Sequence, residues 1–226
     1  MKTTIKICTT ALLLLVSFSG FGQSTFEKSL LKQSGKIPVL DLRSSELEGT
    51  SYINEDFLPA KLSSADKVYA MRYNAYQDEM EYKNDGNSYY LPKNFNYSVT
   101  FTGNNKVYQV YSFEEKGNTK SGFFVVPFSG DKICLLLKEK IEFYEEVPAK
   151  SGYQKSKPPK LKREKDKLYM CYKDNTATEL PSKKKNILLL FSDAAKDIED
   201  YAKKNKLGFS NNEDLIEIFK YFNSLE

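Results

Sequence analysis

Carboxylates and thiols are the side chains of this sequence that could carry out chemistry. The sequence has no histidine, which excludes Ser-His-Asp and Cys-His nucleophile activation and every zinc site that needs an imidazole. Asp78, Glu79 and Glu81 lie close together and could act as acid and base or bind Ca²⁺. Because Glu79 and Glu81 alternate with Met80 and Tyr82, we interpret them as charges on the solvent-facing side of a strand.

Two cysteines, Cys134 and Cys171, follow the N-terminal apolar stretch that holds Cys8. They lie in ICLLLK and LYMCYK, which both have the composition of β-strands. In an oxidising compartment a disulfide between them would link two strands and stabilise the fold by about 2–4 kcal/mol. Two buried free thiols that pack as small apolar groups are the alternative. Sequence spacing does not decide between the two.

The sequence contains no cofactor signature. Two thiols are too few for a four-cysteine zinc site, and neither a C-x-x-C pair nor a glycine-rich phosphate loop is present. Tryptophan is absent, which weakens the case for a carbohydrate platform, although tyrosine also stacks on sugars. We therefore expect a protein that is not an enzyme and that has no cofactor and no metal site.

Tyrosines gather in the segment Lys67–Pro92, which holds six of the chain's 16. Tyrosine combines an apolar ring with a polar hydroxyl and is enriched at protein interfaces. One interpretation is ordinary packing at the rim of a β domain, and the other is an exposed binding face. The candidate binding residues of that face are Tyr69, Tyr73, Tyr76, Tyr82, Tyr89 and Tyr90.

Residues 148–167 interrupt the alternating pattern with eight Lys or Arg, two acids and three prolines. Such a stretch is usually a solvated loop or hinge. The alternative is a basic loop that docks on an acidic partner or on anionic lipid head groups. Its candidate binding residues are Lys155, Lys157, Lys160, Lys162 and Arg163.

The N-terminus has the three parts of a secretory signal peptide. Lys2 and Lys6 precede the apolar run 7–18, and Ser19–Gly22 supplies small residues. A permanent anchor is the alternative, but a membrane span needs about 20 apolar residues. We predict cleavage after Gly22 and a periplasmic or secreted protein that is not an integral membrane protein. Loss of the two lysines lowers the formal charge from +4 to about +2, which gives no reason to expect a nucleic-acid partner.

Short alternating segments separated by Gly, Asn and Asp turns fill most of the remaining chain. Asp85-Gly86 is the strongest turn signal, because both residues favour the positive φ of a tight hairpin. We expect irregular packing over 49–62 and a longer polar connection over 114–121. The expected strands cover 68–73, 80–82, 88–91, 97–101, 106–113, 122–128, 133–147 (as one bent strand or two), 168–172 and 176–180.

The period changes after Pro181, where helical spacing replaces alternation. We expect a short apolar helix over 183–191, an amphipathic helix after it, and a final helix that a capping box opens at Ser210–Glu213. The predicted fold class is α+β: an antiparallel β sandwich or partly open barrel followed by a small helical segment. The expected organisation is a signal peptide (1–22), a flexible N-terminal arm (23–36), a β domain (37–180) with its basic loop, and C-terminal helices (181–226).

Several short segments resemble uncharacterised secreted proteins of Bacteroidota-type bacteria. The segments that carry the resemblance are Tyr52–Asp56, Arg72–Asn74, Asp78–Tyr82, Ser121–Phe124 and Tyr221–Leu225. The resemblance implies no activity. Exports of such bacteria use a large outer-membrane translocon, which implies a role as an accessory or plug-like subunit on its periplasmic side.

Three function classes follow from these observations. The first is a non-catalytic periplasmic subunit that binds another protein, such as an outer-membrane β-barrel in a secretion or transport complex. The second is a β-barrel that binds a small apolar or saccharide ligand. The third is a carboxylate-dependent hydrolase, which needs two carboxylates facing one cleft about 5–10 Å apart. We rank them in this order.

Overall fold

The computed structural model describes residues 47–149, 156–172 and 174–225. The predicted signal peptide, the predicted N-terminal arm and Lys155 lie outside these residues. The strands are β1 (Leu58–Leu62), β2 (Val68–Asn74), β3 (Glu79–Asn84), β4 (Asn87–Tyr90), β5 (Ser98–Phe101), β6 (Lys106–Glu115), β7 (Asn118–Ser129), β8 (Cys134–Lys138), β9 (Ile141–Tyr144), β10 (Lys160–Arg163), β11 (Lys167–Cys171) and β12 (Thr176–Glu179). The helices are α2 (Lys184–Leu189), the short 3₁₀ helix η1 (Ser192–Ala194), α3 (Ala195–Lys204) and α4 (Asn212–Ser224).

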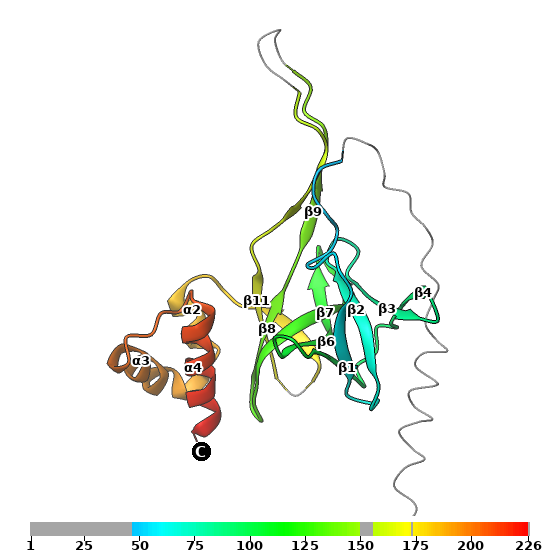
Figure 1. The fold of residues 1–226 in the computed structure, drawn as a ribbon. Helices are drawn as coiled ribbons and strands as arrows, with labels where there is room; N and C mark the ends of the chain where they lie inside the picture. The colour runs from blue at the N-terminus through cyan, green and yellow to red at the C-terminus, as the bar shows by residue number, and fades with distance from the viewer. Residues whose placement is uncertain (1–46, 150–155, 173, 226) are drawn as a thin grey trace, which may run out of the picture.

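A five-stranded barrel forms the centre of the molecule (Figure 1). Strands β12, β11, β8, β7 and β6 are neighbours in this order, and β12 also pairs in parallel with β6. Strand β6 divides its edge: Lys106–Gln109 pairs with β5, whereas Ser112 and Phe113 pair with β12. This division closes the barrel and lets the remaining strands continue as an extension of the sheet.

The side chains that point into the barrel form a compact aromatic core. Alternation along β6 and β7 sends Tyr111, Phe113 and Phe124 inward, where they meet Leu136 and Tyr169. The ring of Phe124 lies 5.4 Å from that of Phe113 and 5.1 Å from that of Tyr169, in edge-to-face geometry. These side chains fill the barrel and hold its strands together.

The extension strands β5, β1, β2, β3 and β4 pack on one outer side of the barrel. Met71 and Met80, both fully buried, belong to the same core cluster as Phe123 and Val110 on the outer face of β7 and β6. This second core is the larger one and includes several tyrosines. The predicted irregular segment 49–62 is wrong in its second half, because β1 pairs there with both β2 and β5.

The C-terminal helices cover the opposite outer side of the barrel (Figure 1). Ile198 of α3 and Phe219 of α4 pack with Leu135 and Met170, which point outward from β8 and β11. Asn223 fixes the end of α4 to the β7–β8 turn, because its Oδ1 accepts from Lys132 N (2.8 Å) and its Nδ2 donates to the Ile133 carbonyl (3.2 Å).

Tight turns that the local sequence encodes connect several strands. Asp85 and Gly86 have φ values of 49° and 77°, which confirms the predicted hairpin between β3 and β4. Lys116 and Gly117 adopt φ values of 53° and 77° between β6 and β7. The predicted long connection over 114–121 is therefore wrong: the strands continue through polar residues to a two-residue turn.

The predicted α+β class, with a β-rich part followed by helices, is confirmed at that level. Among the strands of the described residues, the pairings are antiparallel except for β6–β12. The predicted helix starts differ by a residue or two; for instance, Asn211 is the N-cap of α4 and its side chain accepts from Glu213 N at 2.9 Å. None of the helices over the described ranges is long and apolar enough to cross a membrane.

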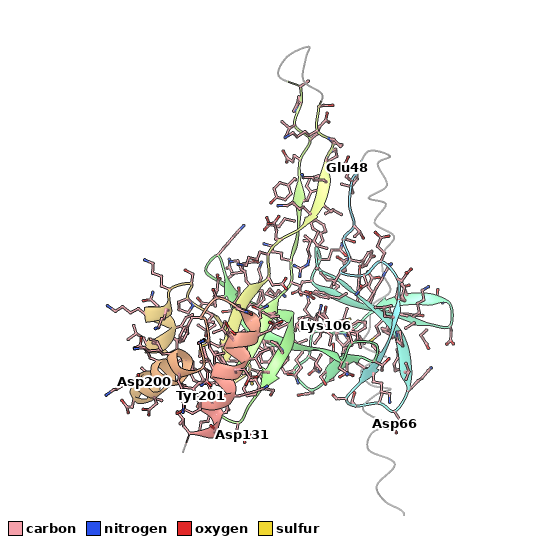
Figure 2. The ribbon with its side chains drawn as sticks, turned by 60° about the vertical axis from the view of Figure 1, so that its left-hand side comes forward. Glu48, Asp66, Lys106, Asp131, Asp200 and Tyr201 are labelled. Carbon is pink, nitrogen blue, oxygen red and sulfur yellow. The ribbon has the colours of Figure 1, made fainter. Side chains whose placement is uncertain are left out.

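A two-stranded projection rises from the barrel (Figure 1). It consists of residues 141–149 and 156–163, in which β9 pairs with β10 and Val147 pairs with Lys157. Glu48 lies beside its lower part (Figure 2), where Glu48 N donates to the Pro159 carbonyl and Leu161 N donates to the Glu48 carbonyl. The predicted basic loop 148–167 is thus wrong as a loop, because it contains β10 and the start of β11.

Candidate functional site

A cavity of about 730 Å³ lies at one mouth of the barrel, at the foot of the projection. Its wall comes from the ends of β6, β8 and β12 and the starts of β7 and β11, together with the β2–β3 turn. We call it the mouth cavity. Its lining contains the aromatic rings of Phe113 and Tyr169 and charges of both signs, and Lys140 and Glu142 join it to the projection.

Asp78 and Lys138 form an ion pair in the wall of this cavity. Lys138 Nζ lies 2.7 Å from Asp78 Oδ1 and donates to the Phe123 carbonyl at 2.9 Å. The same carboxylate oxygen accepts from the Tyr73 hydroxyl (2.6 Å) and from Phe123 N (3.1 Å). One carboxylate therefore joins the β2–β3 turn to two barrel strands.

The surroundings of Lys138 disfavour its charge, and the ion pair counters that effect. Burial lowers the pKa of the Lys138 ammonium, while the Asp78 carboxylate acts in the opposite direction. Gly122 makes the close approach possible, because a Cβ at this position would lie 2.6 Å from Lys138 Nζ. A side chain at residue 122 would thus displace the pair.

A second cluster of charges fixes the projection to the barrel. The buried carboxylate of Glu139 lies 2.7 Å from Lys106 Nζ and 3.1 Å from an Arg163 guanidinium nitrogen, and it accepts from the Tyr108 hydroxyl. Arg163 also pairs with Asp166. Since Glu139 follows β8 and Arg163 ends β10, this cluster holds both strands of the projection at their base.

The prediction that both carboxylates of β3 face solvent is wrong for Glu81. Glu81 is 1% exposed, and it accepts from Arg72 Nε at 2.8 Å and from the Tyr52 hydroxyl at 3.1 Å. The register places Arg72 directly opposite Glu81, which explains how a carboxylate is tolerated there. Glu79 pairs with Lys93 at 3.0 Å. Asp78, Glu79 and Glu81 are each bound to a cation, so their arrangement does not provide the free acid and base of a hydrolase.

The alternative of an exposed tyrosine face is also wrong for most of its residues. Tyr69, Tyr73 and Tyr82 are 2–3% exposed and belong to the core between the extension strands and the barrel. These three residues follow the alternative interpretation of ordinary packing, because alternation along β2 and β3 turns their rings inward. Tyr89 and Tyr90 are half-buried, and Tyr76 is 40% exposed at the mouth cavity.

Buried tyrosines predict a steep loss of stability at alkaline pH. Burial raises the pKa of Tyr73, Tyr97, Tyr108, Tyr111 and Tyr169 above the ordinary value of about 10. Above that pH the unfolded chain loses these protons before the folded one does, so the free energy of unfolding falls as pH rises. It is unaffected by these groups below pH of about 9.

Tyrosinate absorbance measures this effect without interference from tryptophan, which the chain lacks. We expect the buried tyrosines to ionise together with loss of the circular-dichroism signal. Ionisation of these buried tyrosines near pH 10 while the protein remains folded would contradict their burial.

The projection exposes apolar side chains to solvent. Phe143 is 46% exposed, Tyr144 39% and Val147 48%. Successive strand residues point to opposite faces, so Phe143 and Tyr144 lie on the two faces of the ribbon. Glu142 carries charge on β9 and Glu145 follows its end, whereas β10 carries Lys and Arg.

The predicted basic residues lie on this projection, except Lys155, which is outside the described residues. Lys160 and Lys162 stand over the ring of Tyr144, at 6.0 and 5.6 Å from its centroid. Lys157 is exposed near Val147, and Arg163 is held in the cluster around Glu139. The structure therefore separates these residues from the tyrosines of β2 and β3, instead of joining them in one face.

Two residues of this region could not be singled out from the sequence. Lys138 and Glu139 stand in the run Lys138-Glu139-Lys140, which has the appearance of an ordinary solvated stretch. A period-two count from the buried Leu136 would have pointed Lys138 inward and provided the one available signal.

The two candidate disulfide cysteines lie opposite each other at the other end of the barrel, with free thiols. Over the described ranges, no group of three or more Cys, Asp or Glu side chains could hold a metal ion.

The barrel, its mouth cavity and the projection define the class of this chain as a small β-barrel protein with an extended sheet. Comparisons with known proteins find no match, whether with protein-family models, curated proteins or solved structures.

Proposed function

We propose that this chain is a non-catalytic binding protein that docks on another protein through the projection. One observation carries the proposal: the ribbon of β9 and β10 extends from the body while Phe143 and Val147 remain about half-exposed. An isolated two-stranded ribbon is at best marginally stable in water. Exposed apolar residues on such a ribbon favour an interaction surface that a partner protein covers.

The shape of the projection defines the kind of partner. Because Phe143 and Tyr144 lie on opposite faces, a protein that covers both must surround the ribbon, as a groove does. Aromatic residues at the centre of a contact with charges around them match the usual anatomy of protein interfaces. Glu142, Lys160 and Lys162 share the face of Tyr144, because paired strand residues point to the same side. The wall that covers this face should therefore carry charges of both signs.

The base of the projection is built to hold it in one direction. Glu139 binds Lys106 and Arg163, and the buried side chains of Ile141 in β9 and Leu161 in β10 belong to the core. A preorganised ribbon loses less entropy on binding than a flexible loop does.

The compartment is part of the proposal. The predicted signal peptide over residues 1–22 supports a location in the periplasm or outside the cell. The Bacteroidota-type resemblance favours an accessory or plug-like subunit of an outer-membrane complex. An outer-membrane β-barrel that opens a groove to the periplasm is the partner we propose.

Affinity purification from the cell envelope in mild detergent tests this function. We expect the tagged protein to recover one partner in stoichiometric amount. The Phe143→Ser/Val147→Ser variant should bind that partner at least about tenfold more weakly, because a central interface residue contributes about 1–2 kcal/mol or more to the binding free energy.

The matched control is Phe95→Ser/Val68→Ser. Phe95 is 43% exposed and Val68 47%, so the control removes the same two side-chain types at similar exposure, away from the projection. Equal recovery of a partner by all three proteins would place the contact elsewhere. Repeated recovery of the protein alone would count against protein binding.

The mouth cavity supports a second candidate function, the binding of a small ligand. Its volume of about 730 Å³ suits a small molecule. Aromatic side chains fill the barrel itself, so such a ligand would occupy the mouth, where Phe113 and Tyr169 lie among charged groups. These surroundings favour a saccharide over an apolar ligand. A purified monomer that carries a small molecule, identified by mass spectrometry, would favour this candidate over the first.

A further inference from the structure

The two cysteines lie at the end of the barrel opposite the mouth cavity. Cys134 begins β8 and Cys171 ends β11, whereas Lys138 and Lys167 lie at the other ends of these strands. Here a separate cavity of about 260 Å³ is lined by both cysteines, Tyr111 and Asn175. Nothing in the binding function proposed above uses these thiols.

The register of the sheet places the two thiols face to face. Cys134 and Cys171 are direct Cα partners in the antiparallel pair of β8 and β11. Directly opposed residues have Cα atoms about 4.5–5.5 Å apart, and a disulfide needs about 4.4–6.8 Å. Both side chains point to the same face, since both pack with the cluster inside the barrel. A bridge can therefore form without a change of register.

The two thiols differ in exposure. Cys171 is buried, at 2% exposure, whereas Cys134 is half-buried and borders the cavity. Ser129 Oγ lies 3.6 Å from Cys134 Sγ, and the Gly130 carbonyl oxygen lies 3.9 Å from it. A molecule that enters from solvent therefore meets Cys134 first.

The two thiols also differ in acidity. A hydrogen bond from Cys171 lowers the pKa of Cys134 to about 6, and the same interaction together with burial raises the pKa of Cys171. Cys134, the less buried of the two, is therefore also the more acidic thiol. Among the residues that the structure describes, the other titratable groups around the pair are Tyr111 on β6, Asp131 and Lys132 in the β7–β8 turn, and Tyr172 and Asp174 after β11.

We propose that Cys134 and Cys171 form a thiol–disulfide exchange centre whose substrate is an accessible disulfide of another molecule. The Cys134 thiolate attacks one sulfur of that disulfide, and the other sulfur leaves as a thiolate. Cys171 then loses its proton to the leaving thiolate and attacks Cys134, which releases the second substrate sulfur. The two cysteines are oxidised to one disulfide, and the substrate disulfide is reduced to one thiol, which takes the proton of Cys171, and one thiolate, which takes a proton from water.

The order of attack follows from the structure. Exposure and thiolate character make Cys134 the nucleophile, and burial restricts Cys171 to the second step. The product bridge joins two neighbouring strands of the barrel wall and leaves the sheet order unchanged. Oxidation is therefore compatible with the fold, and the reverse reaction can return the centre to its dithiol form.

Oxidised glutathione is a suitable probe, and intact mass is the readout. All proteins carry Cys8→Ser, so that the two barrel thiols alone report. We expect the folded protein to lose two hydrogens and to retain no glutathione. The Cys171→Ser variant should hold one glutathione on Cys134, because the second step is blocked. The Cys134→Ser variant should react at least about tenfold more slowly than Cys171→Ser while folded.

The pH dependence distinguishes this centre from ordinary thiols. In Cys171→Ser the hydrogen bond that contributes most to the lowered pKa of Cys134 is lost, so the rate of glutathione addition should rise at a higher pH than in the dithiol protein. The first-step rate in the folded dithiol should rise through pH of about 6, compared with about 8.5 for an unperturbed thiol.

Circular dichroism confirms that each variant is folded during the reaction. A stable glutathione adduct on the dithiol protein would show that Cys171 does not resolve it, and would overturn the proposal. Equal rates for the two single variants, or a reaction that starts only in denaturant, would do the same. None of these outcomes bears on the projection, so the binding function is tested separately.

Discussion

Replacing Asp78 by alanine should lower the free energy of unfolding by about 3 kcal/mol or more, because one partner of a buried ion pair is lost. Lys138, whose side chain is 11% exposed, would lose the carboxylate that lies 2.7 Å from its Nζ and would be left without a counterion there. The Tyr73 hydroxyl and Phe123 N would lose the acceptor they share. Urea unfolding measured by circular dichroism gives the difference.

Two further variants make this result specific to the buried pair. Glu179→Ala breaks the exposed ion pair with Lys167, in which both side chains are more than half-exposed, and should change stability by about 1 kcal/mol or less. The double variant Asp78→Ala/Lys138→Met removes both charges and should recover part of the loss. A decrease for Asp78→Ala no larger than that for Glu179→Ala would contradict the role given to the pair.

Replacing Phe124 by alanine should lower the free energy of unfolding by about 3–5 kcal/mol. Its side chain is fully buried at the centre of the barrel, where its ring contacts those of Tyr111, Phe113 and Tyr169. The barrel has few other residues with which to close such a gap. Urea unfolding again measures the change.

Phe95→Ala is the matched control for Phe124→Ala. It removes the same ring from a site that is 43% exposed, and surface substitutions usually stay within about 0.5 kcal/mol. A loss for Phe124→Ala below about 1 kcal/mol would mean that the barrel interior is not the packed core described here.

The parts of the fold that the sequence predicted are those encoded by neighbouring residues. Asp85 and Gly86 both adopt positive φ values, and this local preference defines the tight turn between β3 and β4. Likewise, the apolar spacing of Leu215, Ile218 and Phe219 identifies the buried side of α4. Local periodicity determines these elements without knowledge of what packs on them.

Other features depend on contacts between distant residues, and the sequence did not reveal them. Closure of the barrel needs Ser112 to pair with Thr176, and no local signal marks a parallel pair between strands so far apart. The tyrosines of β2 were misassigned for the same reason, because their burial depends on the outer face of β6 and β7. The strand β10 within the basic run is held at its base by the contact of Arg163 with Glu139, which the sequence does not reveal.

Photo-crosslinking in the cell envelope tests directly whether a partner protein surrounds the projection. A photoreactive phenylalanine analogue replaces Phe143 in one protein and Phe95 in another, two sites with 46% and 43% exposure. We predict one discrete adduct with an envelope protein from position 143 and none from position 95. An adduct from position 95 alone, or none from position 143, would contradict docking through the projection.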